Sequence, residues 1–458
     1  MDVYTCVRLQ HAFFESGQTR SIPFRMEQLR LLHRALQAYE PALQRALAAD
    51  LGKSTFEAYT TEVGFVLSSL SYTMRHLKAW AKVKRVHTPL TMFPATSRIA
   101  YEPFGVALII GPFNYPLQLM LEPLIGAICA GNCAILKPSE QTPRTAQVLD
   151  ELISSTFDPA YICCMQGEAD VTQALLAQPL DFVFFTGSAA VGRVIAHAAA
   201  EQLIPCVLEL GGKSPALIHQ SARLDVAAQR LLWGKLLNAG QTCVAPDYVL
   251  VHRSQKQALV EALIAQCQAF FGEDVQRSPD YGRIVNARHF ARLCAILQAE
   301  SDHVLYGGTT DAADRYISPT LIQVDSPDAP CMREELFGPL LPICAYDTWE
   351  QALQLINLHA KPLALYLFCE DKRVQKEVWR RVRFGGGCVN DTILHLVNPR
   401  LPFGGTGPSG LGQYHGRASF LAFSHPKSTL YKTSRIRLPL LFPPYRPGTE
   451  KLVRRLLK

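Results

Sequence analysis

The stretch Gly105-Val-Ala-Leu-Ile-Ile-Gly-Pro112 decides the fold of this chain. It is a short, continuous apolar run that Gly111-Pro112 ends at once, which is typical of a strand buried on both faces of a parallel sheet. A helical stretch from about 116 to 130 follows, and then comes a second apolar run, Cys133-Ala-Ile-Leu136. Strand, helix and strand at this spacing indicate a doubly wound α/β fold.

The same alternation continues on both sides of this unit. Upstream, apolar residues recur at helical spacing over 25–51 and over about 58–83, and between 87 and 102 prolines and β-branched residues predict an extended or hairpin excursion. Downstream, helices are expected from about 142 to 155 and from about 190. Apolar runs predict further strands at 181–185, 206–210, 215–218, 248–252, 363–369 and 387–390.

Length and composition limit the class of protein. A chain of 458 residues predicts two or three domains. The net charge of +7 is mild, and no dense Lys/Arg block occurs outside the C-terminus, so we expect no nucleic-acid partner. Thirteen scattered cysteines without a Cys-x-x-Cys pair indicate reduced thiols in the cytoplasm and no metal site. We also expect no secretory signal and no transmembrane segment.

Two segments at strand ends have the character of a nucleotide site. Gly187-Ser-Ala-Ala-Val-Gly192 lies between a strand and a helix start, where free N–H groups can hold a pyrophosphate. It lacks the Lys-Ser/Thr of a P-loop, and a simple tight turn explains the same residues. Lys137-Pro-Ser-Glu140 follows the second strand, where dinucleotide folds bind the adenosine ribose; the alternative is an ordinary charged loop.

Three further residues are candidates for chemistry. Cys243, in Gly240-Gln-Thr-Cys-Val244, lies among small and polar residues that predict a loop with exposed side chains, as a reactive thiol needs; a buried structural cysteine is the alternative. Glu209 ends a strand, the position of many catalytic groups in α/β sheets, although a solvated surface carboxylate would fit too. Asn114 follows another strand, and its amide either donates to an oxyanion or caps the next helix.

Eight segments in register resemble an aldehyde dehydrogenase of the short class 3 type, from about residue 12 to 428. They are Gly111-Pro-Phe-Asn-Tyr-Pro116, Leu136-Lys-Pro-Ser-Glu140, Phe185-Thr-Gly-Ser188, Leu208-Glu-Leu-Gly-Gly-Lys-Ser214, Gly240-Gln-Thr-Cys-Val-Ala-Pro246, Glu334-Glu-Leu-Phe-Gly-Pro339, Lys361-Pro-Leu-Ala-Leu-Tyr366 and Leu401-Pro-Phe-Gly-Gly405. Phe113 stands where many members of the wider family have Trp, and the tail lacks the apolar anchor of membrane-bound class 3 relatives.

The resemblance implies an α/β fold with a Rossmann-type cofactor domain, an α/β catalytic domain and a small β bridging arm. The cofactor domain would comprise 1–86 and 103–208, with 410–425 returning to it, and the catalytic domain 209–409. The bridging arm would comprise 87–102 and 426–440, and a basic tail would follow at 441–458. Class 3 relatives are typically dimers, so the resemblance implies a homodimer.

The resemblance also implies a mechanism. Cys243 attacks the aldehyde, and the resulting oxyanion is held by the Asn114 amide and the Cys243 N–H. After hydride transfer, Glu209 activates the water that hydrolyses the thioester. Glu335 resembles the family residue that binds the nicotinamide ribose, and in class 3 members it can also act as a base; both roles stay open.

Cofactor and substrate residues follow from the same resemblance. Lys137 and Glu140 would hold the adenosine ribose, Ser188 would meet the pyrophosphate, and Phe337 would pack at the nicotinamide end. The remaining cofactor-binding candidates are Gly187, Gly192 and Leu210. NAD is expected to be preferred, with NADP also used. The expected substrates are aromatic or medium-chain aliphatic aldehydes, in a pocket that contains Tyr115, Leu119, Trp233 and Thr242.

Three alternatives compete with this interpretation. A thiol hydrolase would explain Cys243 but neither Lys137-Pro-Ser-Glu140 nor the Gly187 segment. A CoA-acylating dehydrogenase would not need Glu209 as a water-activating base. A non-catalytic protein on this fold would be expected to lose Cys243, Glu209 or Asn114, and all three are present.

Overall fold

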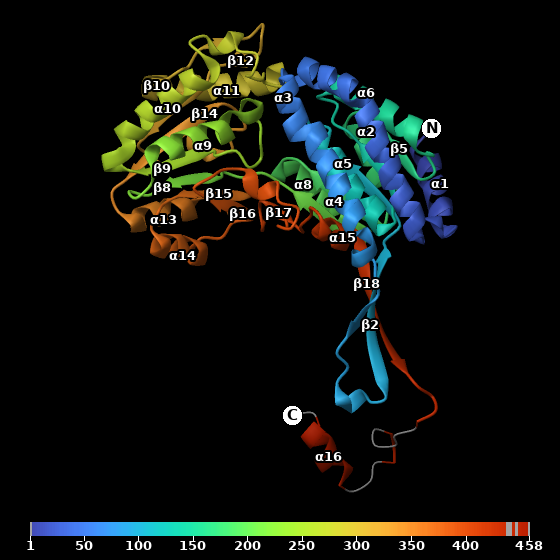
Figure 1. Ribbon diagram of the computed structural model, residues 1–458. Coiled ribbons are helices and arrows are strands. Elements are labelled where there is room, and N and C mark those ends of the chain that lie inside the picture. The colour runs from blue at the N-terminus through green and yellow to red at the C-terminus, as the bar shows by residue number, and fades with distance from the viewer. Residues whose placement is uncertain (1, 437–441, 445–447, 457–458) are drawn as a thin grey trace.

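The computed structural model describes residues 2–436, 442–444 and 448–456. Figure 1 shows two α/β bodies side by side and a narrow arm that extends from one of them. The predicted α/β class is therefore confirmed. Among the described residues, no helix is both long and apolar enough to cross a bilayer.

The first body contains a six-stranded sheet in the order β17-β7-β6-β3-β4-β5. Its strands are β3 (Val106–Ile110), β4 (Cys133–Lys137), β5 (Ile162–Cys164), β6 (Phe182–Thr186), β7 (Cys206–Glu209) and the antiparallel edge strand β17 (Gly410–Leu411). The five parallel strands, taken in chain order, are arranged 3-2-1-4-5, as in dinucleotide-binding folds. The residues of β3 and β4 are all buried, in agreement with their continuous apolar sequences.

The helices of this body form an inner and an outer layer. Next to the sheet lie α5 (Gln118–Ala130) and α6 (Pro143–Thr156), connecting its strands, with α8 (Ala189–Glu201) after β6. The N-terminal helices α2 (Ile22–Leu51) and α4 (Gly64–Trp80) pack against α5 and α6 (Figure 1). The segment between them, α3 (Thr55–Ala58) and the π-helical turn η2 (Tyr59–Val63), thereby reaches from the outer layer toward the second body.

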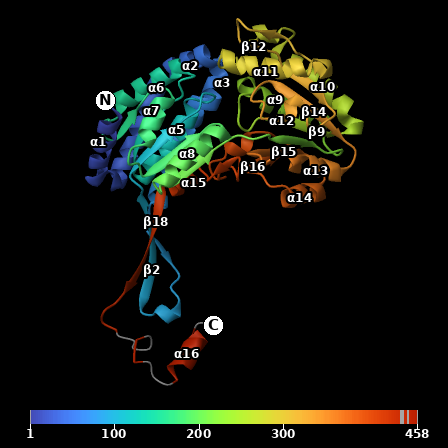
Figure 2. The ribbon, with the colours of Figure 1, turned by 180° about the vertical axis from the view of Figure 1, so that it is seen from behind.

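The second body contains a seven-stranded sheet in the order β10-β13-β14-β9-β8-β15-β16. Only β10 runs antiparallel. The strands are β8 (Pro215–Ile218), β9 (Tyr248–His252), β10 (Val304–Tyr306), β13 (Thr320–Val324), β14 (Leu340–Tyr346), β15 (Ala364–Phe368) and β16 (Gly386–Val389). Its main helices are α9 (Leu224–Leu236), α10 (Lys256–Phe271), α11 (Ala287–Ala299), α13 (Trp349–Leu358) and α14 (Lys372–Arg381). Figure 2 shows this body from behind, with β9, β14 and β15 between α9 and α13.

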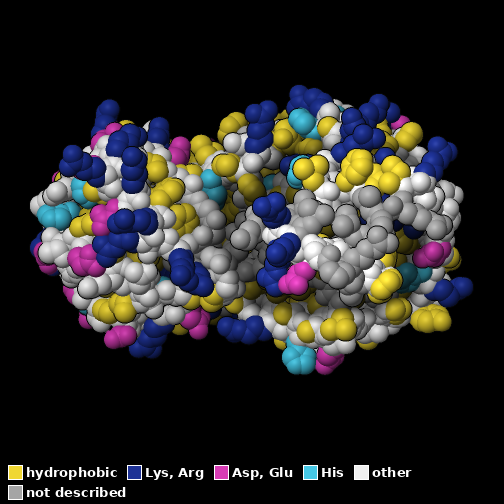
Figure 3. All heavy atoms as spheres, turned by 90° about the horizontal axis from the view of Figure 1, so that it is seen from below, with side chains coloured by type: hydrophobic (Ala, Val, Ile, Leu, Met, Phe, Trp, Pro, Cys, Tyr) yellow, Lys and Arg dark blue, Asp and Glu magenta, His cyan; other side chains and the backbone are white. Residues whose placement is uncertain are grey.

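The arm is a three-stranded antiparallel sheet in the order β1-β2-β18. Its strands are β1 (Lys84–Val86), β2 (Ala95–Pro103) and β18 (Ser424–Lys432), so segments more than 300 residues apart lie side by side. The predicted arm ranges 87–102 and 426–436 lie in this sheet or beside it, whereas 437–440 lies outside the described residues. In the predicted tail the structure describes α16 (Thr449–Leu456). Seen from below, the face around the arm carries many Lys and Arg side chains interspersed with hydrophobic ones (Figure 3).

Candidate active site

The loop that carries Cys243 connects α9 to β9 and has an unusual backbone. Asn238, Ala239 and Gly240 follow one another with φ of 53°, 50° and 79°, in the left-handed region. A Cβ at Gly240 would lie 2.2 Å from the carbonyl oxygen of Gly338, so only glycine fits there. Left-handed residues other than glycine cost roughly 1–2 kcal/mol each, and such a loop persists only where its surroundings hold it in place.

Cys243 itself is partly exposed at the wall of a cavity. The expectation that its neighbours are exposed was wrong, because Gln241 and Thr242 are buried. The Gln241 side chain donates to the Arg283 carbonyl (2.9 Å) and accepts from the Val285 N–H (2.9 Å), which ties the loop into the second body. Small polar residues thus mark a loop here, but hydrogen bonding keeps all but the thiol out of solvent.

Two carboxyl groups act electrostatically on the thiol. Burial raises the pKa of Cys243 to about 12, and the Glu335 and then the Glu209 carboxyl add to this rise. At neutral pH the thiol of the free protein is therefore protonated. A nucleophilic role requires that a nearby base takes its proton or that a bound cation lowers its pKa.

Glu209 is the last residue of β7, in the cofactor-type sheet, and its side chain is buried. Neither carboxyl oxygen has a hydrogen-bond partner, and burial raises the pKa of Glu209 well above its ordinary value. The surface-carboxylate alternative is therefore wrong for this residue. A buried carboxyl without partners is costly, and such groups concentrate at functional sites.

Glu335 reaches the same region from the loop before β14. Burial raises the pKa of Glu335 to about 8 and Asp247 adds to the rise, while the Gly212 N–H opposes it. Its carboxylate lies against Gly211, where an added Cβ would be 2.1 Å from a Glu335 oxygen. The structure thus brings Cys243, Glu209 and Glu335 together from the two bodies.

Asn114 lies in the buried loop after β3, next to the Cys243 loop. Its side-chain Nδ2 donates to the Gln241 carbonyl at 3.0 Å, which uses one of its two N–H groups and leaves the other for a ligand. The alternative role as a helix cap is wrong, because α5 begins at Gln118 and Glu62 accepts the N–H groups of Leu117 and Gln118.

The predicted cofactor residues lie along the carboxyl edge of the six-stranded sheet. Lys137, at the end of β4, is buried and forms an ion pair of 3.6 Å with the exposed Glu140. Ser188 is the N-cap of α8, where its Oγ accepts from the Val191 N–H (3.4 Å). A Cβ at Gly192 would lie 2.6 Å from the Leu210 side chain, so glycine lets α8 pack closely on the end of β7.

This edge fits a nicotinamide dinucleotide. A helix N-terminus can hold a pyrophosphate, and Gly187 and Ser188 lie at the N-terminus of α8. Val191 and Val194 are exposed on the first turns of α8, where a flat base could cover them. Lys137 and Glu140 present a cation and a carboxylate suited to ribose hydroxyls. At the other end, the Phe337 ring packs edge-on against Phe113, with 5.7 Å between centroids.

The cavity beside Cys243 has a volume of about 780 Å³. All four predicted pocket residues, Tyr115, Leu119, Trp233 and Thr242, line it. The Tyr115 hydroxyl and Thr242 Oγ1 are 2.6 Å apart, which joins the two loops at the cavity wall. The sequence did not indicate the further Phe and Tyr side chains of the wall, which come from distant helices and loops: Phe56, Phe65, Phe270, Phe271, Phe403 and Tyr414.

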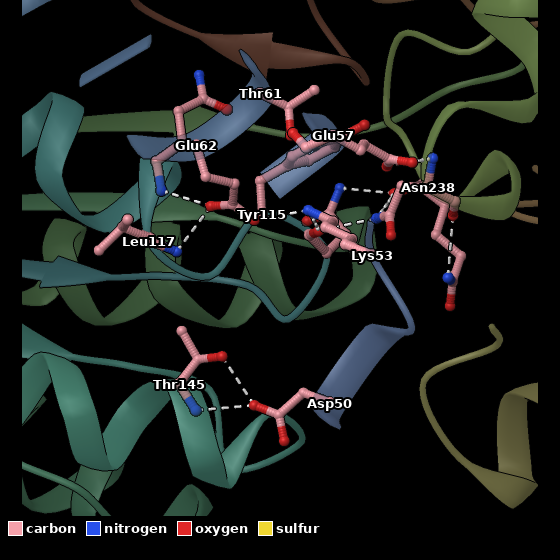
Figure 4. A network of polar contacts seen from close by, with 12 residues as sticks. Asp50, Lys53, Glu57, Thr61, Glu62, Tyr115, Leu117, Thr145 and Asn238 are labelled. Carbon is pink, nitrogen blue, oxygen red and sulfur yellow. Dashed lines mark hydrogen bonds and ion pairs between the residues drawn. The ribbon is translucent and has the colours of Figure 1, made fainter. Parts of the chain in front are cut away.

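A polar network behind the two loops was also missed (Figure 4). Lys53, Glu57 and Glu62 are buried and contact the backbone of the two loops, at Asn114, Leu117 and Asn238. In sequence they are charged residues in or beside a helical segment, and such residues normally face solvent. No local pattern distinguishes them, because their partners lie 55 to 181 residues away.

Comparison with known proteins identifies the family of the chain. The model of the family described as "Aldehyde dehydrogenase family" matches residues 1–429. The chain is 49% identical to the 4,4'-diaponeurosporen-aldehyde dehydrogenase of Staphylococcus aureus (strain NCTC 8325 / PS 47), over 98% of this chain and 97% of that one. It is 43% identical to "Aldehyde dehydrogenase, dimeric NADP-preferring" of Rattus norvegicus, over 92% of each. Other matches are named as family 3 members.

Among solved structures, the chain is similar to the "Substrate bound state of Staphylococcus Aureus AldH". The TM-score is 0.98 at 47% identity, and each chain is covered completely.

Proposed function

The chain belongs to the aldehyde dehydrogenase family and oxidises aldehydes to carboxylic acids with NAD or NADP, and from this premise we propose that Cys243 is its nucleophile. One observation carries the proposal. The Cys243 thiol lies at the wall of an apolar cavity, within electrostatic reach of two carboxyl groups whose pKa values are raised.

The first step would be transfer of the Cys243 thiol proton to a nearby carboxylate and attack of the resulting thiolate on the aldehyde carbon. The second N–H of the Asn114 amide and the Cys243 N–H would donate to the oxygen of the thiohemiacetal, whose negative charge they stabilise. Because Asn114 is held by Gln241, this donor is positioned before the substrate arrives. When bound, NAD(P)+ supplies the hydride acceptor, and loss of the hydride leaves a thioester on Cys243.

Glu209 would then activate the water that hydrolyses the thioester. Its unpartnered oxygens leave it free to accept a proton, and its raised pKa makes its carboxylate a stronger base than an ordinary one. Glu335, with Gly211, Gly212 and Asp247 around it, would instead bind the nicotinamide ribose. Lys137 and Glu140 would hold the adenosine ribose, with Ser188 at the pyrophosphate.

The cavity indicates the class of aldehyde. Its volume of about 780 Å³ is in the upper part of the roughly 300–1,000 Å³ range of small-molecule sites, and aromatic and aliphatic side chains dominate its wall. We expect aromatic and medium-chain aliphatic aldehydes to be substrates. The aldehyde in the name of the 49% identical relative is a further candidate. A profile of kcat/KM against chain length would distinguish these candidates.

NAD is the proposed preferred cofactor, with NADP also used. The exposed Glu140 carboxylate would repel a 2′-phosphate, and Lys137, 3.6 Å away, would offset part of that repulsion. The relative from rat is named NADP-preferring. The quantity to measure is therefore the ratio of kcat/KM with NAD to kcat/KM with NADP.

A homodimer in the cytoplasm is the proposed state. The arm formed by β1, β2 and β18 presents exposed apolar side chains such as Leu90, Phe93 and Tyr431, which a second copy of the chain would cover. The rat relative is named as dimeric. Sedimentation at micromolar concentration should show a dimer, and a monomer or a tetramer would refute this state.

The test of the proposed function is NADH absorbance during turnover of a simple aldehyde, with and without CoA. We expect NADH and free carboxylic acid without CoA. A requirement for CoA would indicate the acylating alternative. Hydrolysis of esters without any aldehyde oxidation would indicate the thiol hydrolase.

A further inference from the structure

Lys53 lies behind the active-site loops, between α2 and α3, and its side chain is fully buried. Its ammonium donates to Glu62 Oε1 (2.6 Å) and to the main-chain carbonyl of Asn114 (3.0 Å), and it lies 4.0 Å from the centre of the Tyr115 ring (Figure 4). All three N–H directions of the ammonium thus have a partner.

The Asn114 carbonyl has a second donor. Asn238 Nδ2 donates to it at 2.8 Å, and the Asn238 N–H in turn donates to Glu57 Oε1 at 2.8 Å. Asn238 opens the left-handed run that leads to Cys243. Asn114 is therefore fixed at its main chain by Lys53 and Asn238 and at its side chain by Gln241.

Glu62 completes the arrangement. One of its oxygens holds Lys53, and the other accepts from the N–H groups of Leu117 (3.0 Å) and Gln118 (2.8 Å), which begin α5. A single N-terminal segment, Lys53 to Glu62, thereby contacts the loop of the oxyanion donor and the loop of the nucleophile.

Stability alone is a poor explanation for this ion pair. Removing two charges from water is expensive, and a buried pair is often replaced by apolar residues without loss of stability. A pair that contacts the backbone of a strained functional loop has another use, which is to fix geometry.

We propose that Lys53, with Glu62 and Glu57, is a positioning residue for the oxyanion hole: the Lys53–Glu62 pair sets the Asn114 amide and Glu57 sets the Cys243 loop. None of these three acts on the reacting atoms. The inference rests on the oxyanion role proposed above for Asn114, through which Lys53 and Glu62 would act.

The test is a double-mutant cycle. The pair variant Lys53→Met/Glu62→Gln removes both charges, so that no buried charge is left unpaired. It is combined with Asn114→Ala, which keeps the main-chain carbonyl but deletes the oxyanion donor. The rate of the NADH burst is measured for the wild type, each variant and the triple variant, at saturating aldehyde and cofactor.

We expect Asn114→Ala to slow the burst by about 10²–10³-fold, as loss of an oxyanion donor does. The pair variant should slow it by about tenfold, because small misplacements of a catalytic group can cost up to about 10²-fold. In the Asn114→Ala background the pair variant should change the rate less than twofold, because its effect passes through the missing amide.

Two outcomes would overturn the proposal: an unchanged burst rate in the pair variant, or an equal loss in both backgrounds. A normal burst rate in Asn114→Ala would instead refute the oxyanion role itself. If the pair variant does not fold, Glu57→Leu is measured instead: because Glu57 acts on the Cys243 loop through Asn238, it should slow the burst in the wild type and in Asn114→Ala alike, and an unchanged burst rate would overturn the proposal.

Asp50→Ala is the matched control. Asp50 is a buried carboxylate at the end of α2. Its Oδ2 accepts from the Thr145 N–H and from Thr145 Oγ1, both at 2.8 Å, at the start of α6 and away from the two loops (Figure 4). Its loss should lower the melting temperature without changing the burst rate. A slower burst in Asp50→Ala would mean that general destabilisation accounts for the pair variant, against the proposal.

Discussion

Glu209 and Glu335 approach Cys243 from different bodies of the molecule, and their surroundings differ. Glu209 ends β7 of the six-stranded sheet, and neither of its oxygens has a partner. Glu335 lies in the loop before β14, with Asp247, Lys213 and the Gly212 N–H acting on it. An unpartnered carboxyl is free to take a proton from water, whereas a carboxyl set among fixed dipoles and charges is suited to hold a ligand hydroxyl. This difference in environment is the basis of the two tasks proposed for these carboxyls.

The largest expected effect concerns the thiol between them. Cys243→Ala should lower aldehyde oxidation by about 10⁴-fold or more, because the aldehyde then has no nucleophile with which to form the thiohemiacetal. Cofactor binding, measured by fluorescence titration, should remain. Activity above a few per cent of wild type would contradict the assignment of Cys243, since another group would then be the nucleophile.

Replacing each of the two carboxyls by an amide in turn separates their roles. Glu209→Gln should keep the NADH burst and lower the steady-state rate by about 10²-fold or more, within the usual range for a general base. Glu335→Gln should raise the KM for the cofactor. NADH should then form at the steady-state rate from the start, without a faster burst phase. Stopped-flow absorbance measures both phases, and the opposite pattern would exchange the assignments.

A third carboxylate, Glu140, differs from both because it is exposed and paired with Lys137. Glu140→Gln should raise the efficiency with NADP relative to NAD by about 1–3 kcal/mol, the range for close charges at a binding site. The gain should appear in the cofactor KM. An unchanged NAD/NADP ratio would place the adenosine ribose elsewhere.

The smallest expected effect is on stability against pH. Burial raises the pKa of Glu335 from an ordinary value of 4.5 to about 8, so the folded protein binds more protons than the unfolded chain between these values. The free energy of unfolding should therefore fall as pH rises through this window. Glu335→Gln should make the melting temperature of the cofactor-free protein less dependent on pH, by a few degrees at most. An identical pH profile would show that Glu335 ionises normally.

The sequence predicted the sheets well and the loops less well. The runs that became β3, β4, β8 and β9 are continuous and apolar, and burial on both faces leaves few alternatives for such segments. Loop composition and strand-end positions indicated the candidates Cys243, Glu209 and Asn114, the family resemblance gave them roles, and the structure brings them to one place.

What the sequence could not supply depends on contacts between distant segments. Lys53 and Glu62 look like surface charges on a helix, and only the packing of α2 and α4 on α5 turns them inward. Gln241 and Thr242 look like exposed loop residues, but they are buried because their partners come from Arg283, Val285 and Tyr115.

The most direct test of the account is to trap the thioester on Cys243. Glu209→Gln is mixed with aldehyde and NAD and quenched in acid, and the Cys243 peptide is weighed by mass spectrometry. We predict that this peptide gains the mass of the aldehyde less two hydrogens in Glu209→Gln, and far less in wild type. An unmodified Cys243 peptide in Glu209→Gln, or acyl groups that accumulate in Glu335→Gln instead, would contradict the assignment of Glu209 as the base that completes turnover.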